Sequence, residues 1–273
     1  MEKFSPASTM TAPVIKKTAP QGSAVAAWLY SPRVLSVVIW LLLWQLVVTI
    51  LQPELLPAPT AVFESLWQHA VRGDLVSQLA VTLRRLVIAF SLALLLGMVL
   101  GLAMGHFKRL NDWLDSILTL MLNIPALVTI ILCLMWLGLN EVAAVTAVVM
   151  NKLPNMAAIF REGAKAVNRE LLEVAKVYRL PASKALFKVY LPQLAPYFLA
   201  AARTGQALVW KIVLVVELLG CSSGVGFKLS VFFQMFDITS ILAYTLAFVA
   251  IIYSFESFIL RPWERRINRW QQC

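Results

Sequence analysis

The stretch LAVTLRRLVIAFSLALLLGMVLGLAM, residues 79–104, decides the fold class of this 273-residue chain. It is long enough to cross the hydrocarbon core of a bilayer, which takes about 20 apolar residues per helix. The whole chain has the same character, because 60% of its residues are hydrophobic and only 14% are charged, whereas soluble domains are about 25% charged. This composition excludes a disordered protein, a collagen and a soluble enzyme, and it predicts an integral membrane protein.

Five further apolar stretches resemble the first, so we expect an all-α polytopic membrane protein with about six transmembrane helices. The predicted spans are residues 34–51, 79–104, 113–139, 142–160, 194–219 and 238–260. Pro125 interrupts the third span and Pro154 lies inside the fourth, and either proline can kink its helix. Residues 53–74 contain an amphipathic run, which favours an interfacial helix at the outer surface.

The distribution of Lys and Arg predicts the orientation of these spans. With the N-terminus inside, 17 of the 24 basic residues fall in cytoplasmic segments, whereas the outer loops hold only Arg72 and Lys228. Both termini are therefore expected in the cytoplasm. The expected parts are a flexible cytoplasmic tail (1–33), a first transmembrane helix with an outer interfacial segment (34–78), a transmembrane domain (79–260) that includes a cytoplasmic loop (161–192), and a basic cytoplasmic tail (261–273).

The residue types needed for catalysis and metal binding are scarce. Three scattered cysteines and two histidines fit no disulfide framework or metal site. No Walker-type glycine loop and no nucleophile with its base is present in the sequence, so we expect no enzyme activity, no cofactor and no ATP hydrolysis by this chain. The net charge of +10 is explained by membrane topology, and a nucleic-acid partner is not expected.

The largest polar insertion between spans, residues 161–192, carries apolar residues at helical spacing, and Pro181 divides it into two short helices. Such a hairpin either packs on the bundle or docks a soluble partner. Glu173-Val174-Ala175 is followed, after thirteen residues, by Val189-Tyr190-Leu191-Pro192. This spacing resembles the EAA loop of binding-protein-dependent ABC importer permeases. Arg179 stands where that pattern has glycine, and a non-glycine residue is disfavoured there if the φ angle is positive.

The resemblance covers about residues 56–266. Within this range the chain is similar to the nitrate/sulfonate/taurine branch of these permeases. The segments that carry it are Leu55 to Pro59, Thr82-Leu83-Arg84-Arg85, Trp136 to Glu141, Glu217-Leu218-Leu219 and Gly224-Val225-Gly226. It implies the MetI-like permease fold and the role of a transmembrane permease subunit in an ATP-driven ABC importer. Such a subunit moves a small polar or anionic solute across the bacterial inner (plasma) membrane by alternating access.

The same resemblance implies partners and a contact surface. The expected partners are two copies of an ABC ATPase, a periplasmic or extracellular solute-binding protein, a second permease copy in a homodimer, and membrane lipid. The ATPase is expected to dock on Glu173 and Ala175 with Leu171 and Leu172, and the motif is completed by Val189, Leu191 and Pro192.

Polar side chains inside the spans predict a translocation pathway, because ionisable groups in a membrane usually face a cavity or a partner. The candidate lining residues are Asn151, Lys152, Gln206, Lys211 and Glu217. Their positive potential favours an anionic solute. In the alternative interpretation, Lys152 or Lys211 pairs with Glu217 or snorkels to the surface.

Three glycines recur at every fourth residue, Gly97, Gly101 and Gly105, so that one side of the helix carries no side chains at these positions. Such a face allows a close helix–helix contact, either between two copies or within one chain.

Two other functions compete with the importer. A self-contained secondary transporter or channel usually shows an internal repeat, and none is found in the sequence. A scaffold or translocase subunit would not explain polar groups inside three spans.

Overall fold

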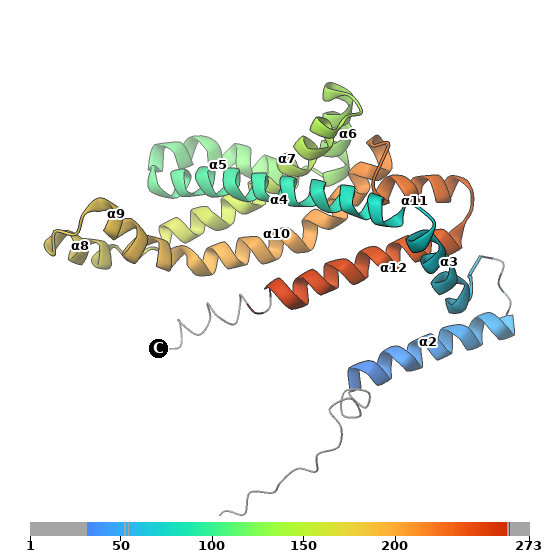
Figure 1. Cartoon of the computed structure of the whole chain (residues 1–273). Helices are drawn as coiled ribbons and strands as arrows, with labels where there is room; N and C mark the ends of the chain where they lie inside the picture. Colours follow the sequence, from blue (N-terminus) through green and yellow to red (C-terminus); the bar gives the residue numbers. More distant parts are fainter. Residues whose placement is uncertain (1–31, 52, 54, 261, 263–273) are drawn as a thin grey trace, which may run out of the picture. The chain divides into compact units, whose positions relative to one another are not determined.

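The computed structural model describes residues 32–51, 53, 55–260 and 262, and in this part of the chain all regular structure is helical (Figure 1). The predicted all-α class is confirmed. The tails predicted at 1–33 and 261–273 lie almost entirely outside the described residues. The helices are α2 (Pro32–Leu51), α3 (Pro59–Val71), α4 (Leu75–His106), α5 (Lys108–Asn123), α6 (Ala126–Leu137), α7 (Glu141–Lys165), α8 (Arg169–Val177), α9 (Ala182–Ala185), the π-helix η1 (Leu186–Tyr190), α10 (Leu191–Gly220), α11 (Val225–Gln234), α12 (Ile238–Phe255) and the π-helix η2 (Glu256–Leu260).

The chain divides into two units, Met1–Pro53 and Glu54–Cys273. In the first unit, α2 is a 20-residue apolar helix that corresponds to the first predicted span. In the second unit, α4, α7, the continuous stretch Ala182–Gly220 and α12 are long and apolar enough to cross a membrane. With α2 and the pair α5–α6, these helices account for the six predicted spans.

The third predicted span is a bent pair of helices rather than one straight helix. The axes of α5 and α6 differ by 99° across a short break. Ile124 is extended, with φ −72° and ψ 126°, because the ring of Pro125 disfavours the helical conformation in the residue before it. Pro154, by contrast, stays inside α7, where its missing N–H removes one backbone hydrogen bond without ending the helix.

The centre of the second unit is the contact between α4 and α7, against which α10 and α6 also pack. The glycine face of α4 makes this contact possible. A Cβ atom on Gly97 would lie 2.6 Å from Cβ of Met156, one on Gly101 would lie 2.7 Å from Cβ of Phe160, and one on Gly105 would lie 2.9 Å from the carbonyl oxygen of Arg161. At these three positions the close helix–helix contact is within the chain, between α4 and α7.

A second apolar cluster lies where α11 and α12 meet the start of α4. It contains Leu75, Leu79, Val225, Phe232, Tyr244 and Phe248. The amphipathic α3 packs on α12, and His69 of α3 makes a hydrogen bond of 3.0 Å with Ser240 of α12. This cluster anchors the segment that the sequence predicted to be interfacial.

Candidate functional site

The loop between α7 and α10 folds into α8 and a turn that leads directly into the next helix. The Asn168 side chain caps α8 by accepting a hydrogen bond of 2.8 Å from the backbone N–H of Glu170, as N-cap residues do. The Gln193 side chain accepts a hydrogen bond of 2.8 Å from the backbone N–H of Asn168 and donates one of 2.9 Å to the carbonyl of Val189. The base of the loop is therefore tied to the start of α10.

The C-terminus of α8 ends in a Schellman motif centred on Arg179. The backbone N–H of Leu180 donates to the carbonyl of Ala175 at 3.0 Å, and that of Arg179 donates to the carbonyl of Lys176 at 2.9 Å. This motif needs a residue in the left-handed conformation, and Arg179 has φ 51°. An L-residue in that conformation costs about 1–2 kcal/mol. The positive φ angle that was considered for this position from the sequence is therefore present in the structure.

After this turn the structure differs from the expected pair of short helices. The second helix is not short, because Ala182–Gly220 runs as one 39-residue stretch through the π-helical turn η1. Val189 lies half-buried in η1, while Leu191 and Pro192 are exposed at the start of α10. The loop thus continues directly into a helix long and apolar enough to cross a membrane.

The outward face of α8 carries four exposed apolar side chains, Leu171, Val174, Val177 and Tyr178, which we call the α8 stripe. Their exposed fractions are 48%, 49%, 80% and 76%. Residues three, four and seven apart share one side of a helix, so the stripe is continuous. Of the predicted docking residues, Leu171 belongs to it and Glu173 is exposed beside it, whereas Leu172 is half-buried and Ala175 is buried.

Sequence reasoning did not name Val174, Val177 and Tyr178 as candidate docking residues. Their spacing from Leu171 groups them on one side of the helix.

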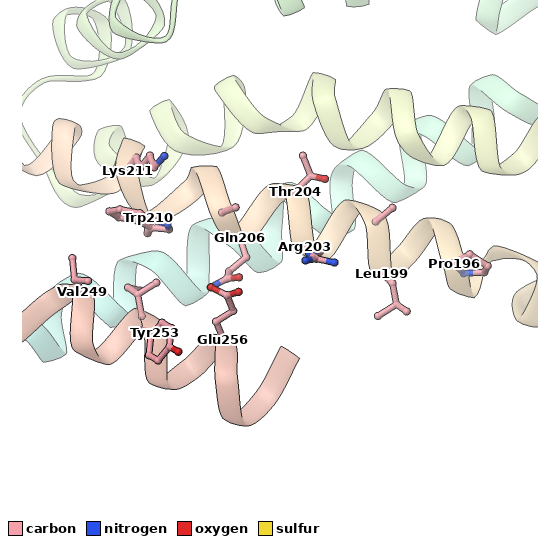
Figure 2. Close-up of a pocket in the computed structure, with 13 residues that line it drawn as sticks. Pro196, Leu199, Arg203, Thr204, Gln206, Trp210, Lys211, Val249, Tyr253 and Glu256 are labelled. Carbon is pink, nitrogen blue, oxygen red and sulfur yellow. The ribbon is translucent and has the colours of Figure 1, made fainter. Parts of the chain in front are cut away.

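The five predicted pathway residues do not lie together in the structure. Gln206 and Lys211 line an open groove of about 680 Å³ between α10 and α12, together with Arg203, Trp210 and Glu256 (Figure 2). The side chains of Gln206 and Glu256 point toward one another across this groove. The Lys211 Nζ atom lies 5.4 Å from the centroid of the Trp210 ring.

The other three predicted residues do not line this groove. Lys152 is buried in α7 and Asn151 is half-buried beside it. Glu217 lies near the other end of α10 and is fully buried. The pathway roles of these residues stay predictions, and the structure shows what surrounds Glu217.

Glu217 is held in a buried polar network. One carboxylate oxygen accepts a hydrogen bond of 2.8 Å from Arg85 Nη1, and the other accepts bonds of 2.8 Å from Thr82 Oγ1 and 2.9 Å from the backbone N–H of Gly226. Gly224 adopts φ 104°, and a Cβ atom there would overlap the Glu217 carboxylate. The partner of Glu217 is therefore Arg85, not Lys152 or Lys211.

Arg85 links this network to the start of α7. Its Nε and Nη2 atoms donate to the two carboxylate oxygens of Glu141 at 2.7 and 2.6 Å, and it also donates to the backbone carbonyl of Ser223 at 2.6 Å. Arg84 lies 3.3 Å from the same Glu141 carboxylate. Two arginines and two glutamates thus meet, so the network has no net charge in its fully ionised form. Sequence reasoning placed Thr82, Arg84, Arg85 and Glu217 in recognised motifs without bringing them together.

A smaller polar cluster surrounds Asp74 at the start of α4. The carboxylate accepts hydrogen bonds from Tyr244 at 2.8 Å and Gln78 at 3.1 Å, and it lies 2.6 Å from Lys228 Nζ. Burial alone would raise the pKa of Asp74, but these three donors outweigh it and lower the pKa to about 2. The cluster joins α4, α11 and α12 at one end of the unit.

Together, the fold and this loop define a class: a polytopic helical permease whose long helix α10 extends out of the bundle into the loop that carries α8. Comparison with known proteins gives the family. Residues 93–268 match the family described as "binding-protein-dependent transport system inner membrane component", and the chain belongs to that family.

Curated relatives are similar along most of their length. The chain is 26% identical over 231 residues to the putative aliphatic sulfonates transport permease protein SsuC of Bacillus subtilis (strain 168), covering 84% of this chain and 83% of the relative. It is 27% identical over 237 residues to the taurine transport system permease protein TauC of Escherichia coli (strain K12), covering 84% and 86%. It is 26% identical over 214 residues to the nitrate import permease protein NrtB of Synechocystis sp. (strain ATCC 27184 / PCC 6803 / Kazusa), covering 74% and 78%.

A solved structure supports the fold. The crystal structure titled "Crystal structure of an amino acid ABC transporter with histidines" contains a chain that matches with a TM-score of 0.54 and 24% identity, covering 70% of this chain and 93% of that one. The chain is thus a multi-pass inner-membrane permease subunit of an ABC importer, of the nitrate/sulfonate/taurine branch. Subunits of this family are not themselves enzymes, and membership implies partnership with an ATPase and a solute-binding protein.

Proposed function

We propose that this permease moves a small polar or anionic solute, of the kind named for its sulfonate, taurine and nitrate relatives, and that the α8 stripe is the surface on which its ATPase docks. The single observation that carries the docking proposal is the continuous row of exposed apolar side chains on α8. Exposed apolar patches in otherwise polar surroundings are typical of protein–protein contacts. The two flanking glutamates, Glu170 and Glu173, are also exposed on this helix.

The connection between the loop and the membrane supports coupling. Because Ala182–Gly220 is one helical stretch, a displacement of α8 is transmitted along it to Gln206 and Lys211 in the groove. Gln193 holds the base of the loop to this stretch, because its side chain accepts a hydrogen bond from the backbone N–H of Asn168. Nucleotide-driven movement of the ATPase would then shift α10 as a rigid element, which is a form of alternating access.

The charges in and around the groove support an anionic solute. Arg203 and Lys211 supply two cations to the groove wall, and Glu256 supplies one carboxylate. Glu217 does not oppose this potential, because Arg85 neutralises it at the other end of α10. The roles of Asn151, Lys152 and Glu217 as further lining residues belong to the same proposal.

The assembly that we propose contains two copies of this chain, two ATPases and one solute-binding protein. Both chain termini and the loop at 161–192 face the cytoplasm, and α3 faces the opposite side, as the distribution of Lys and Arg indicates. The tails at 1–33 and 261–273 and the permease domain at 79–260 keep the boundaries expected from the sequence.

A pair of matched substitutions tests the docking surface. Val177→Asp places a carboxylate in the α8 stripe, and Val71→Asp makes the same change at the end of α3, where the side chain is also exposed, at 60% against 80% for Val177. Each variant is reconstituted in nanodiscs and titrated with the ATPase subunit of its importer. We expect Val177→Asp to weaken ATPase binding by about tenfold or more, since an unpaired charge is trapped in an apolar contact.

Val71→Asp should leave ATPase binding unchanged. Equal affinities for the two variants would contradict the docking proposal. Thermal unfolding of both variants checks that neither change disturbs the fold.

A further inference from the structure

Arg179 combines an unfavourable backbone conformation with a solvent-exposed side chain. Among the described residues, Arg179 and Phe236 are the non-glycine residues with positive φ angles. A glycine would adopt the same Schellman turn without steric cost, so the turn itself does not require an arginine. Backbone strain of this kind is concentrated at functional sites. The guanidinium group is therefore the part of Arg179 that needs a functional explanation.

Among the residues that the structure describes, none makes a contact that would explain an arginine at this position. Arg179 is exposed, and in the part of the chain that the structure describes its guanidinium has no hydrogen bond, ion pair or aromatic contact. The exposed ionisable residues around it are mostly basic, since Arg169, Lys176, Lys184 and Lys188 outnumber Glu170 and Glu173 in the same loop. The loop as a whole therefore presents an excess of positive charge.

Arg179 directly follows Tyr178, the last residue of the α8 stripe. The exposed side chain of Arg179 therefore starts at the edge of the stripe, within reach of a partner that covers Tyr178. Arginine presents a planar fork of donors that matches a carboxylate in two parallel hydrogen bonds. This geometry gives more specificity than the ammonium group of a lysine.

We propose that Arg179 is a specificity residue of the docking surface, and that it binds a carboxylate on the ATPase subunit. This inference rests on the proposed function, because it takes the α8 stripe to be the ATPase contact. The basic loop attracts an acidic surface of the partner. The ion pair with Arg179 then fixes the position of that surface along α8. The strain in the free turn is balanced by the ion pair formed in the complex.

Three substitutions separate charge from backbone conformation. Arg179→Gly and Arg179→Asn both tolerate the left-handed conformation and both remove the charge, whereas Arg179→Lys keeps the charge without the planar fork. Each variant is placed in nanodiscs of phosphatidylcholine alone and in nanodiscs that also contain anionic lipid, and its affinity for the ATPase is measured at low and high NaCl. Thermal unfolding of the free permease is measured in parallel.

We expect Arg179→Gly and Arg179→Asn to keep or raise the unfolding temperature of the free permease, while weakening ATPase binding about fivefold at low salt. Their affinities should also depend less on salt than that of the unmodified chain. Arg179→Lys should retain part of the affinity. A loss of affinity together with greater stability cannot arise from misfolding.

Unchanged affinity and unchanged salt dependence in Arg179→Gly would overturn the inference. If Val177→Asp still weakens binding in that case, the docking surface stands and only the role of Arg179 fails. If neither variant weakens binding, the docking proposal fails as well. A loss that appears only in nanodiscs containing anionic lipid would assign the guanidinium to lipid headgroups, which would also overturn the inference.

Discussion

Arg84 and Arg85 are neighbours in sequence and touch the same glutamate, yet their surroundings differ completely. The Arg84 side chain is 62% exposed, whereas the Arg85 side chain is 5% exposed and meets the fully buried carboxylate of Glu217. Exposed ion pairs contribute about 0–1 kcal/mol. Removing one partner from a buried pair costs about 3–5 kcal/mol, because the other charge is left uncompensated.

We therefore expect Arg85→Ala to lower the free energy of unfolding by about 3–5 kcal/mol, and Arg84→Ala to change it by less than about 1 kcal/mol. Thermal or denaturant unfolding in detergent measures both. Adding Glu217→Gln to Arg85→Ala should recover part of the loss, since it removes the unpaired charge. Equal destabilisation by the two alanine variants would show that the network does not depend on burial.

At the residue scale, the sequence identified the polar groups but not their partners. Glu217 was recognised as an ionisable residue near the end of a span, and Lys152 and Lys211 were weighed as its partners. The actual partner, Arg85, is separated from it by 132 residues. Helical periodicity relates positions within one helix, but it does not reveal which helices meet or at what height.

At the scale of single elements, the glycine face of α4 can be tested directly. Gly101→Leu inserts a side chain where even a Cβ atom would lie 2.7 Å from Cβ of Phe160. We expect it to lower the free energy of unfolding by about 2 kcal/mol, since overpacking usually costs about 1–3 kcal/mol, although leucine is the better helix former. Val99→Leu is the control, because Val99 is 60% exposed on the same helix.

Unfolding of the two variants in detergent gives the comparison. If Gly101→Leu is as stable as Val99→Leu, the contact between α4 and α7 can separate at little cost. The glycine face would then have no structural role in the free chain.

Element boundaries also show where periodicity succeeds and where it does not. The long apolar runs predicted α4, α7, α10 and α12 within a few residues, since length and composition alone define them. The third span is interrupted at Pro125, as the sequence predicted, but the sequence did not predict the size of the bend, which is 99° between α5 and α6. The loop helix α8 was predicted. Spacing alone groups Leu171 with Val174 and Val177, but tertiary packing fixes which side of α8 contacts η1 and which side stays exposed.

At the scale of the whole molecule, α10 connects two sites of different character. One end continues through η1 into the docking loop, and the other ends at Glu217 in the neutral network. Gln206 and Lys211 lie between them in the groove. This arrangement puts the proposed ATPase contact, the predicted pathway residues and a fixed anchor along one helical stretch, which is what the transmission of a movement through a rigid element requires.

The charge of the pathway leads to a prediction about the intact importer. Replacing both Lys152 and Lys211 with glutamine should reduce ATP-driven uptake of an anionic solute such as nitrate or an alkanesulfonate by about tenfold, because the attraction between the wall and the solute is weakened. Lys165→Gln is the control, since Lys165 is exposed at the end of α7. Uptake is measured in proteoliposomes that contain the complete complex.

Unchanged uptake in the double variant would remove the lysines from the pathway. The docking experiment is independent of this outcome, because it measures only ATPase binding.

The neutral network has a consequence for how the chain is made. Arg85 leaves the ribosome 56 residues before Glu141 and 132 residues before Glu217. At about 5–20 residues per second, the helix carrying this cation therefore waits several seconds or longer for its final counter-charge. Assembly is thus ordered in time: Arg85 can engage Glu141 when α7 is synthesised, and arrival of α10 completes the set. The polar contacts of α4 are therefore complete only after α7 and α10 have been inserted.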